Sequence, residues 1–152
     1  MPQEVEILLV DDNASDVELT VRALRGRKLA NSIHVAEDGQ QALDFVFCRD
    51  AYSERSFASP PKVIFLDLKM PKVDGIEVLR AIRGDARTRA IPVVILTSSK
   101  EQRDIVEGYK LGVNAYIQKP VDFDEFRRVI EQMGMFWLVV NQPPPREAFP
   151  AT

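Results

Sequence analysis

The sequence predicts an α/β protein built around a parallel sheet, and three observations support this. Short apolar runs alternate along the chain with segments of helical periodicity, as expected for repeated strand and helix units. The strand expected at 63–68 begins with the unbroken apolar run 63–66, which is typical of a central parallel strand with helices on both faces. Several runs end in polar residues, and open α/β sheets hold their ligands at the carboxyl ends of their strands.

The first five elements follow from apolar spacing along residues 5–68. Short apolar runs predict strands, and apolar residues three or four positions apart predict the helices between them. The first helix has two candidate N-caps, a capping box of Ser15 with Glu18 and, as the alternative, Asn13. The expected elements in chain order are a strand at 5–10, a helix at 15–25, a strand at 33–36, a helix at 40–47 and a strand at 63–68.

The remaining elements are predicted in the same way. The spacing of Ile76, Leu79 and Ile82 indicates a helix, and Pro92 marks the start of the strand that follows it. The expected elements in chain order are this helix, a strand at 93–96, a more polar helix at 100–111, a strand at 114–118 and a helix carrying Phe123, Phe126, Ile130 and Met133.

The residues at the strand ends predict a site for phosphoryl chemistry. They are Asp11 and Asp12, Asp67, Thr97 and Lys119. An aspartate carboxylate can attack a phosphoryl group and form an acyl phosphate if a divalent cation and a lysine neutralise the charge. We therefore expect Asp67 to be the nucleophile, Lys119 a charge clamp and Thr97 a hydroxyl donor to a phosphoryl oxygen. Asp11 and Asp12 would hold Mg²⁺, which suits a site of few carboxylates.

Four strings of sequence around these residues resemble the receiver domains of two-component response regulators. They occupy 9–13, 66–75, 95–98 and 115–120, and the resemblance covers residues 5–133. It implies a flavodoxin-like (βα)₅ fold, a three-layer sandwich whose five-stranded sheet has the strand order 2-1-3-4-5. It also implies that a partner histidine kinase transfers a phosphoryl group to Asp67.

The resemblance also implies a set of metal ligands. Mg²⁺ would be held by Asp12, Asp67 and the backbone carbonyl of Lys69, and Asp11 would help through a water molecule. The lifetime of the acyl phosphate would depend on side chains such as Lys69 and Ser99, which can screen or orient the attacking water.

A switch is implied as well. Thr97 would turn toward the phosphoryl group and Tyr116 would swing inward after it, although an aromatic residue in a strand most often only packs. The bond before Pro120 is expected to be cis, which would shape a tight turn and aim Lys119 at the site.

The C-terminal segment is expected to join two copies of the chain. Apolar residues continue past the last helix on every side, and a helix that is apolar all round is normally buried. A symmetric homodimer would bury it, and the alternative is a tail folded back on its own domain. Residues 135–140 could be a helix or an extended arm, because Gly134 lowers helix preference by about 1 kcal/mol. The expected interface residues are Phe126, Ile130, Met133, Phe136, Trp137, Leu138 and Val140.

These features predict the domain organisation. Residues 1–140 would form a receiver domain that includes the dimerisation extension, and 141–152 a Pro-rich mobile tail. The long connection at 48–62 would be either a solvated spacer or a loop that contacts a partner. This long connection and the Phe-Trp-Leu ending at 136–138 resemble those of the single-domain response regulators of bacterial phytochromes, whose kinases sense red light.

Composition excludes several classes of partner and place. The net charge of −3 and the lack of a basic stripe give no support to a nucleic-acid partner. No apolar run approaches about 18 residues and no basic, apolar leader is present, so we expect a cytoplasmic protein without a membrane span. The length of 152 residues leaves no room for a DNA-binding output domain, and one cysteine, Cys48, excludes an internal disulfide.

Rival functions fit less well. A Mg²⁺-dependent phosphatase of the haloacid dehalogenase class needs a second aspartate as general acid where this chain has Lys69. A receiver used only as an interaction module would lack one of the site residues, and this chain has them all. A nucleotide-binding protein would carry a Gly-rich phosphate-binding loop after a strand, and this chain has none. We therefore expect a phosphoacceptor rather than an enzyme, with at most slow autophosphorylation from small donors and slow autodephosphorylation. A histidine phosphotransfer protein is a second candidate partner.

Overall fold

A computed structural model describes residues 5–30 and 32–150 and confirms the predicted fold. The five parallel strands form one sheet in the order β2-β1-β3-β4-β5. They are β1 (Ile7–Val10), β2 (Ile33–Ala36), β3 (Val63–Leu66), β4 (Val93–Thr97) and β5 (Ala115–Gln118). The helices are α1 (Ala14–Gly26), α2 (Gly39–Val46), α3 (Gly75–Arg83), α4 (Gln102–Lys110) and α5 (Phe123–Gly134). In the described part of the chain, no helix has the length and apolar character that crossing a bilayer requires.

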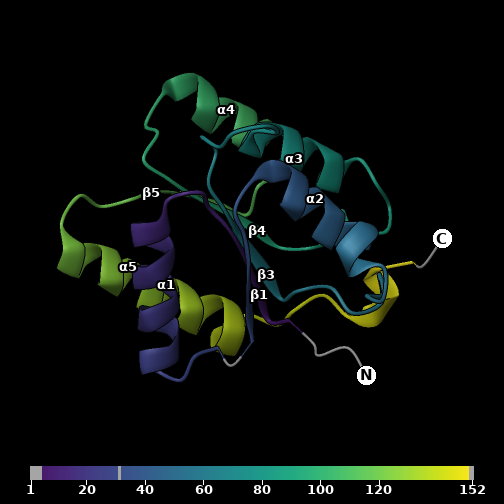
Figure 1. The fold of residues 1–152 in the computed structure, drawn as a ribbon, viewed down its shortest axis with the longest axis horizontal. Coiled ribbons are helices and arrows are strands. Elements are labelled where there is room, and N and C mark those ends of the chain that lie inside the picture. Colours follow the sequence, from purple (N-terminus) through teal and green to yellow (C-terminus); the bar gives the residue numbers. More distant parts are fainter. Residues whose placement is uncertain (1–4, 31, 151–152) are drawn as a thin grey trace.

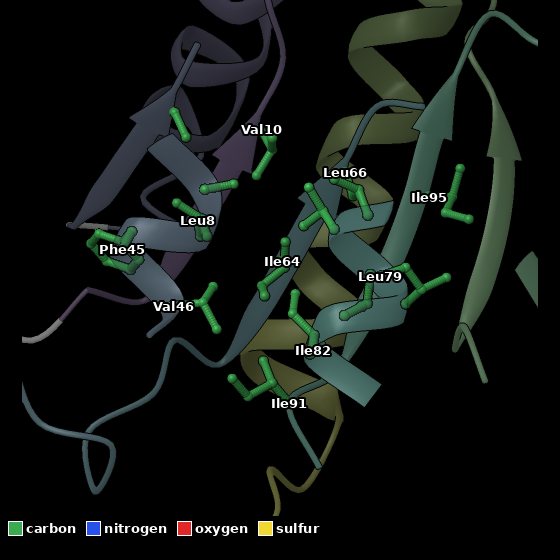
Figure 2. Packing of buried hydrophobic residues seen from close by; sticks show 14 of the residues in the cluster. Leu8, Val10, Phe45, Val46, Ile64, Leu66, Leu79, Ile82, Ile91 and Ile95 are labelled. Atoms are coloured by element: carbon green, nitrogen blue, oxygen red, sulfur yellow. The ribbon is translucent and has the colours of Figure 1, made fainter. Parts of the chain in front are cut away.

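The sheet lies between two layers of helices. Figure 1 shows α1 and α5 on one side of it and α2, α3 and α4 on the other. Alternate residues of each strand supply two hydrophobic cores, so that on β1 Leu8 and Val10 belong to one core and Ile7 to the other. In Figure 2, Phe45 from α2 and Leu79 from α3 lie in the first of these cores.

The strand register brings the strand ends together. Val10 is paired with Leu66 across β1 and β3, so the residues that follow both strands lie side by side. The backbone N–H of Asp67 donates to the carbonyl of Val10 at 2.9 Å, and that of Lys119 donates to the carbonyl of Thr97 at 2.7 Å. Local pairing alone therefore places the predicted site residues at one edge.

The start of α1 corrects one prediction. The Asn13 side chain is the N-cap and accepts a hydrogen bond from the Asp16 backbone N–H at 3.0 Å. Ser15 lies inside the first turn, so the capping box of Ser15 with Glu18 is wrong and the alternative is confirmed. The chain leaves β1 after two aspartates, and Asn13 is the residue that keeps the extended backbone a cap requires.

The connection between α2 and β3 is attached to the domain through Tyr52 and Arg55, while many of its other residues are exposed to solvent. A short 3₁₀ turn, η1 (Asp50–Tyr52), places the Tyr52 hydroxyl 3.1 Å from His34 Nε2. The Arg55 guanidinium lies over the Phe45 ring, 3.6 Å from its centre, and donates to the Phe45 carbonyl. Contact between this loop and a partner stays a prediction.

The last helix continues beyond its expected end. After Gly134 the chain keeps helical geometry through a π-helical turn, η2 (Met135–Val140), in which the Asn141 N–H donates to the Phe136 carbonyl at 2.6 Å. This segment is therefore helical and not an extended arm. Gly134 has a packing role, because a Cβ there would lie 2.6 Å from a methyl group of Leu24 on α1.

The structure corrects three of the predicted interface residues. Phe126, Ile130 and Met133 are buried in their own domain, in the core between α1, α5 and the sheet. Helical spacing finds the buried face of a helix but does not say which surface covers it, and here the sheet does. Trp137 and Leu138 are half-buried against the same core.

Four apolar side chains at the end of this helix remain exposed. They are Met135, Phe136, Val139 and Val140. Of the predicted interface, Phe136 and Val140 are therefore the residues available to a partner.

The segment after residue 140 packs on the domain instead of forming the predicted mobile tail. It returns to the amino end of the sheet, close to the start of the described chain (Figure 1). A 3₁₀ turn, η3 (Arg146–Ala148), leads into Phe149, whose side chain is only 6% exposed within the core of α2 and α3. The Pro-rich composition suggested mobility, but a single buried aromatic side chain is enough to anchor a short segment to the domain. Residues 151 and 152 of the predicted tail lie outside the described part.

Candidate functional site

The predicted site residues meet at the carboxyl end of the sheet. Asp11, Asp67, Thr97 and Lys119 are all buried there, although polar groups are rarely buried unless they are paired. Asp12 is exposed at the rim. Sequence reasoning from strand ends therefore found the central members of the site.

Lys119 is the hub of the site. Its Nζ donates to Asp11 Oδ2 and to Asp16 Oδ2, both at 2.8 Å, and to Asp67 Oδ2 at 3.0 Å. An ammonium has three protons, so each has a carboxylate acceptor. No peptide bond in the described residues is cis, so the prediction of a cis bond before Pro120 is wrong for this structure. The lysine reaches all three carboxylates from a trans bond.

Asp16 is the site residue that sequence reasoning missed. It lies in the first turn of α1 and is half-buried, and its carboxylate approaches Lys119 from the helix layer. Its one available signal was its position three residues after the cap, which turns it back over the end of β1. An acidic residue in a first helical turn is common, so this signal is weak.

The charges of this cluster are balanced unevenly. Burial alone would lower the pKa of Lys119, but hydrogen bonds to Asp11 and Asp16 outweigh it and raise that pKa above its usual value. Burial raises the pKa of Asp11, against the hydrogen bond from Lys119 that lowers it. A cation bound beside Asp11 would favour its ionised form against this effect of burial.

Asp67 is held on both sides. The Thr97 hydroxyl donates to Asp67 Oδ1 at 2.7 Å, and the Lys69 backbone N–H approaches the same oxygen at 3.4 Å. Gly75, at the start of α3, packs on the backbone of Asp67, since a Cβ there would lie 2.2 Å from the Asp67 carbonyl oxygen. The backbone at Asp67 is therefore held by a close contact with the start of α3, which leaves no room for a side chain at position 75.

The acidic residues fit a divalent cation. Asp11, Asp12 and Asp67 each offer one carboxylate oxygen, and these atoms all lie within 4.8 Å of one another. Carboxylate oxygens are the hard ligands that Mg²⁺ prefers. Asp11 already accepts from the Asn13 N–H at 2.9 Å and from Lys119, which is compatible with the water-mediated role predicted for it. A role for the Lys69 carbonyl stays a prediction.

Tyr116 lies near this site. It is half-buried on β5, and its hydroxyl donates to the Ser99 carbonyl at 2.9 Å, two residues beyond Thr97. The aromatic ring is thus linked to the loop that follows Thr97 at the end of β4. Its movement as a switch stays a prediction.

Comparisons with known proteins agree with this geometry. The sequence pattern of the response regulator receiver domain matches residues 7–131. Response regulator Rcp1 from Synechocystis sp. is 34% identical over 133 residues, which span 87% of this chain and 88% of Rcp1.

Solved structures give the same result. The Mn²⁺-bound form of Rcp1 superposes with a TM-score of 0.86 and covers 93% of this chain and 99% of its own at 32% identity. The phosphorylated cyanobacterial phytochrome response regulator RcpA has a TM-score of 0.87 over 93% and 99% of the two chains, at 33% identity. The bacteriophytochrome response regulator RtBRR is 49% identical, with a TM-score of 0.73 over 95% and 86% of the chains.

Proposed function

This chain belongs to the family of response regulator receiver domains, and we propose that it accepts a phosphoryl group on Asp67 from a partner histidine kinase. The observation that carries the proposal is the hold on Asp67, whose two oxygens accept hydrogen bonds from Thr97 and Lys119 inside a buried site. Two side chains that can bind phosphoryl oxygens thus already lie beside the proposed nucleophile.

The residues of the site have separate tasks in this reaction. An oxygen of Asp67 attacks phosphorus, the bond from phosphorus to the donor breaks, and the donor leaves with the electron pair. Lys119 and Thr97 can exchange their hydrogen bonds to Asp67 for bonds to phosphoryl oxygens as that charge arrives. Asp16 would keep its hydrogen bond to the Lys119 ammonium while the ammonium turns toward the phosphoryl group.

Mg²⁺ is the cofactor that we assign to this site. Asp12, Asp67 and the Lys69 carbonyl would bind it, with Asp11 acting through water, and the bound ion would supply charge neutralisation for the incoming phosphoryl group. The related Rcp1 has been solved with Mn²⁺, an ion that takes similar oxygen ligands.

Phosphorylation would then change the surface of the domain. A phosphoryl group adds about −1.5 to −2 charge at Asp67, and the loop after Thr97 would move as the Thr97 hydroxyl turns from Asp67 to a phosphoryl oxygen. Because the Tyr116 hydroxyl bonds the Ser99 carbonyl in that loop, the aromatic ring would follow. We assign Thr97 and Tyr116 as the switch, read out at the surface of α4, β5 and α5.

The kinase partner is proposed to be of the phytochrome type. This rests on the similarity to RcpA and RtBRR, which are described as phytochrome and bacteriophytochrome response regulators. A histidine phosphotransfer protein is a second candidate partner, and a cytoplasmic location suits both. The protein would be a signalling acceptor whose own activities are limited to slow self-phosphorylation from small donors and slow self-dephosphorylation.

A homodimer is proposed through the end of the last helix. Met135, Phe136 and Val140 are exposed and line a hollow of about 460 Å³ together with Leu29 and Arg27. Exposed apolar patches of this kind mark interaction surfaces. The pair of Phe136 with Trp137, whose rings lie 5.0 Å apart, gives the patch a fixed aromatic edge.

The test is phosphate uptake measured by intact mass. Wild type, Asp67→Asn and Asp124→Asn would be incubated with acetyl phosphate, with Mg²⁺ or with a chelator. We expect one phosphate on the wild type and on Asp124→Asn, which alters an exposed carboxylate paired with Arg127, and only when Mg²⁺ is present. Asp67→Asn should take none while its circular dichroism spectrum is unchanged.

Two results would contradict the proposal. Phosphate on Asp67→Asn would place the acceptor elsewhere, and no uptake by the wild type from either acetyl phosphate or a phytochrome kinase would favour a pure interaction module. Light scattering of the same samples tests the dimer, since Phe136→Asp should yield monomers if the exposed patch joins two copies.

A further inference from the structure

One carboxylate on α4 holds two side chains that flank the acceptor site. Asp104 Oδ2 accepts a hydrogen bond from the Ser99 hydroxyl at 2.5 Å and lies 3.3 Å from Lys69 Nζ. The Ser99 hydroxyl and the Lys69 ammonium hold the pKa of Asp104 below its usual value, so that the carboxylate is ionised at neutral pH. Three different elements are thus joined at this point.

The backbones of the same two residues touch the site itself. The Lys69 N–H approaches Asp67 Oδ1 at 3.4 Å, and the Ser99 N–H approaches Thr97 Oγ1 at 3.3 Å. The side chains of Lys69 and Ser99 therefore start beside the acceptor, and Asp104 draws both toward α4. A lysine has a flexible stem of four carbons, so its ammonium points toward whichever nearby acceptor binds it best.

The ion pair between Lys69 and Asp104 can be exchanged for another partner of the lysine. The Lys69 side chain is 55% exposed, so water and other acceptors can compete with Asp104 for its ammonium. The pair lines a groove of about 310 Å³ with Leu68, Met70 and Asp74 next to the acceptor loop. The groove borders the residues that directly follow Asp67, so the Lys69 ammonium lies at its wall and close to the acceptor.

We propose that Asp104 is a positioning residue that shortens the lifetime of the phosphorylated state by drawing the Lys69 ammonium away from the phosphoryl group. The proposal rests on the phosphorylation of Asp67 proposed above. It assigns a regulatory task to a carboxylate that contacts neither the nucleophile nor its partners Thr97 and Lys119.

The reaction affected is hydrolysis of the acyl phosphate. A water oxygen forms a bond to phosphorus, the bond between phosphorus and the Asp67 oxygen breaks, and the carboxylate leaves with the electron pair. The water gives up its proton to solvent, and the products are free Asp67 and inorganic phosphate. An ammonium on the outward phosphoryl oxygens would occupy the approach of this water, so a lysine held by Asp104 leaves the approach open.

The substitution that tests this is Asp104→Asn. An asparagine has nearly the same shape and can still accept from the Ser99 hydroxyl, but it loses the charge that attracts Lys69. The freed ammonium should bind the phosphoryl group, and we expect the first-order rate constant of phosphate loss to fall about three- to tenfold, which corresponds to about 0.7–1.4 kcal/mol in the barrier.

The measurement uses the full chain phosphorylated with acetyl phosphate and freed of donor in Mg²⁺ buffer. Released inorganic phosphate is followed for wild type, Asp104→Asn, Lys69→Ala, the double variant and Glu107→Gln. Glu107→Gln removes a carboxylate from the same helix, where it pairs with Arg80, and should leave the rate unchanged. In the Lys69→Ala background, Asp104→Asn should have no further effect.

The outcomes separate this inference from the function on which it depends. If the wild type takes up phosphate and Asp104→Asn loses it at the same rate or faster, the positioning role is wrong while the function stands. If the slower rate persists in the double variant, Asp104 acts through helix packing and not through Lys69, and the proposal is also wrong. Absence of phosphate on the wild type would instead refute the proposed function.

Discussion

The two ends of the parallel sheet are held by different physical interactions. At the carboxyl end, buried carboxylates surround one ammonium, and few apolar contacts are made. At the amino end, the returning C-terminal segment buries Phe149 next to the residues that precede β1 and β3. The first arrangement is specific and electrostatically expensive, because buried ions lose their hydration. The second is apolar and tolerant.

This difference separates function from stability. Charges at the carboxyl end can change partners when a phosphoryl group or a cation arrives, whereas the contacts of Phe149 at the amino end are apolar and do not depend on charge. Substitutions should therefore have distinct consequences at the two ends.

The largest effect is expected for Lys119→Met. It leaves three carboxylates without their common cation, and removing one partner of a buried ion pair costs about 3–5 kcal/mol. Urea unfolding in chelator should show this loss, and Mg²⁺ should restore part of it. The matched control is Lys72→Met, whose side chain is largely exposed and whose ion pair with Asp38 should contribute about 1 kcal/mol or less. Equal stability of Lys119→Met and wild type in chelator would refute the account of the carboxyl end.

A smaller effect, confined to stability, is expected for Phe149→Ala. Truncation of a buried phenylalanine costs about 3 kcal/mol at the low end of its usual range, which suits a side chain at the edge of a core. Phosphate uptake, measured at a temperature where the variant is folded, should match the wild type. Phe123→Ala, which removes a largely exposed ring, should leave the unfolding midpoint nearly unchanged. A loss of uptake in folded Phe149→Ala would show that the two ends are coupled.

The smallest effect concerns acid stability at the amino end. Hydrogen bonds from the Arg87 side chain and backbone lower the pKa of Asp85, in the connection before β4, to about 2. A lowered folded pKa adds stability that is complete above the unfolded pKa and is lost as the pH falls toward the folded one. Wild type should therefore exceed Asp85→Asn in unfolding free energy by more at about pH 6 than at about pH 3. Arg87→Gln should reproduce the pattern, and a constant gap would refute it.

Sequence reasoning succeeded where one local rule decides the outcome. Asp67 and Lys119 were found because each follows an apolar run, and the ends of neighbouring parallel strands must lie together. It failed where the answer depends on which surfaces meet. To predict the contact of Asp16 with Lys119, one must know the direction in which α1 crosses the sheet. To predict the burial of Phe149, one must know the path of the C-terminal segment across the molecule.

The last helix shows both results in one element. The spacing of Phe126 and Ile130 correctly predicted a buried face, but the sequence could not tell a neighbouring sheet from a second copy of the chain. The choice between Ser15 and Asn13 as the cap was equally undetermined, because both residues cap helices well and only the exit path of β1 separates them.

The third carboxylate that Lys119 binds, that of Asp16, should make phosphorylation depend on ionic strength. With Asp16 included, four carboxylates and one ammonium leave an excess of three negative charges around the acceptor. Such a concentrated field attracts a divalent cation and repels an anionic phosphate donor, and salt screens both effects. Rising salt would therefore loosen the cation while easing the approach of the donor, so that the rate of phosphorylation should pass through a maximum at an intermediate salt concentration.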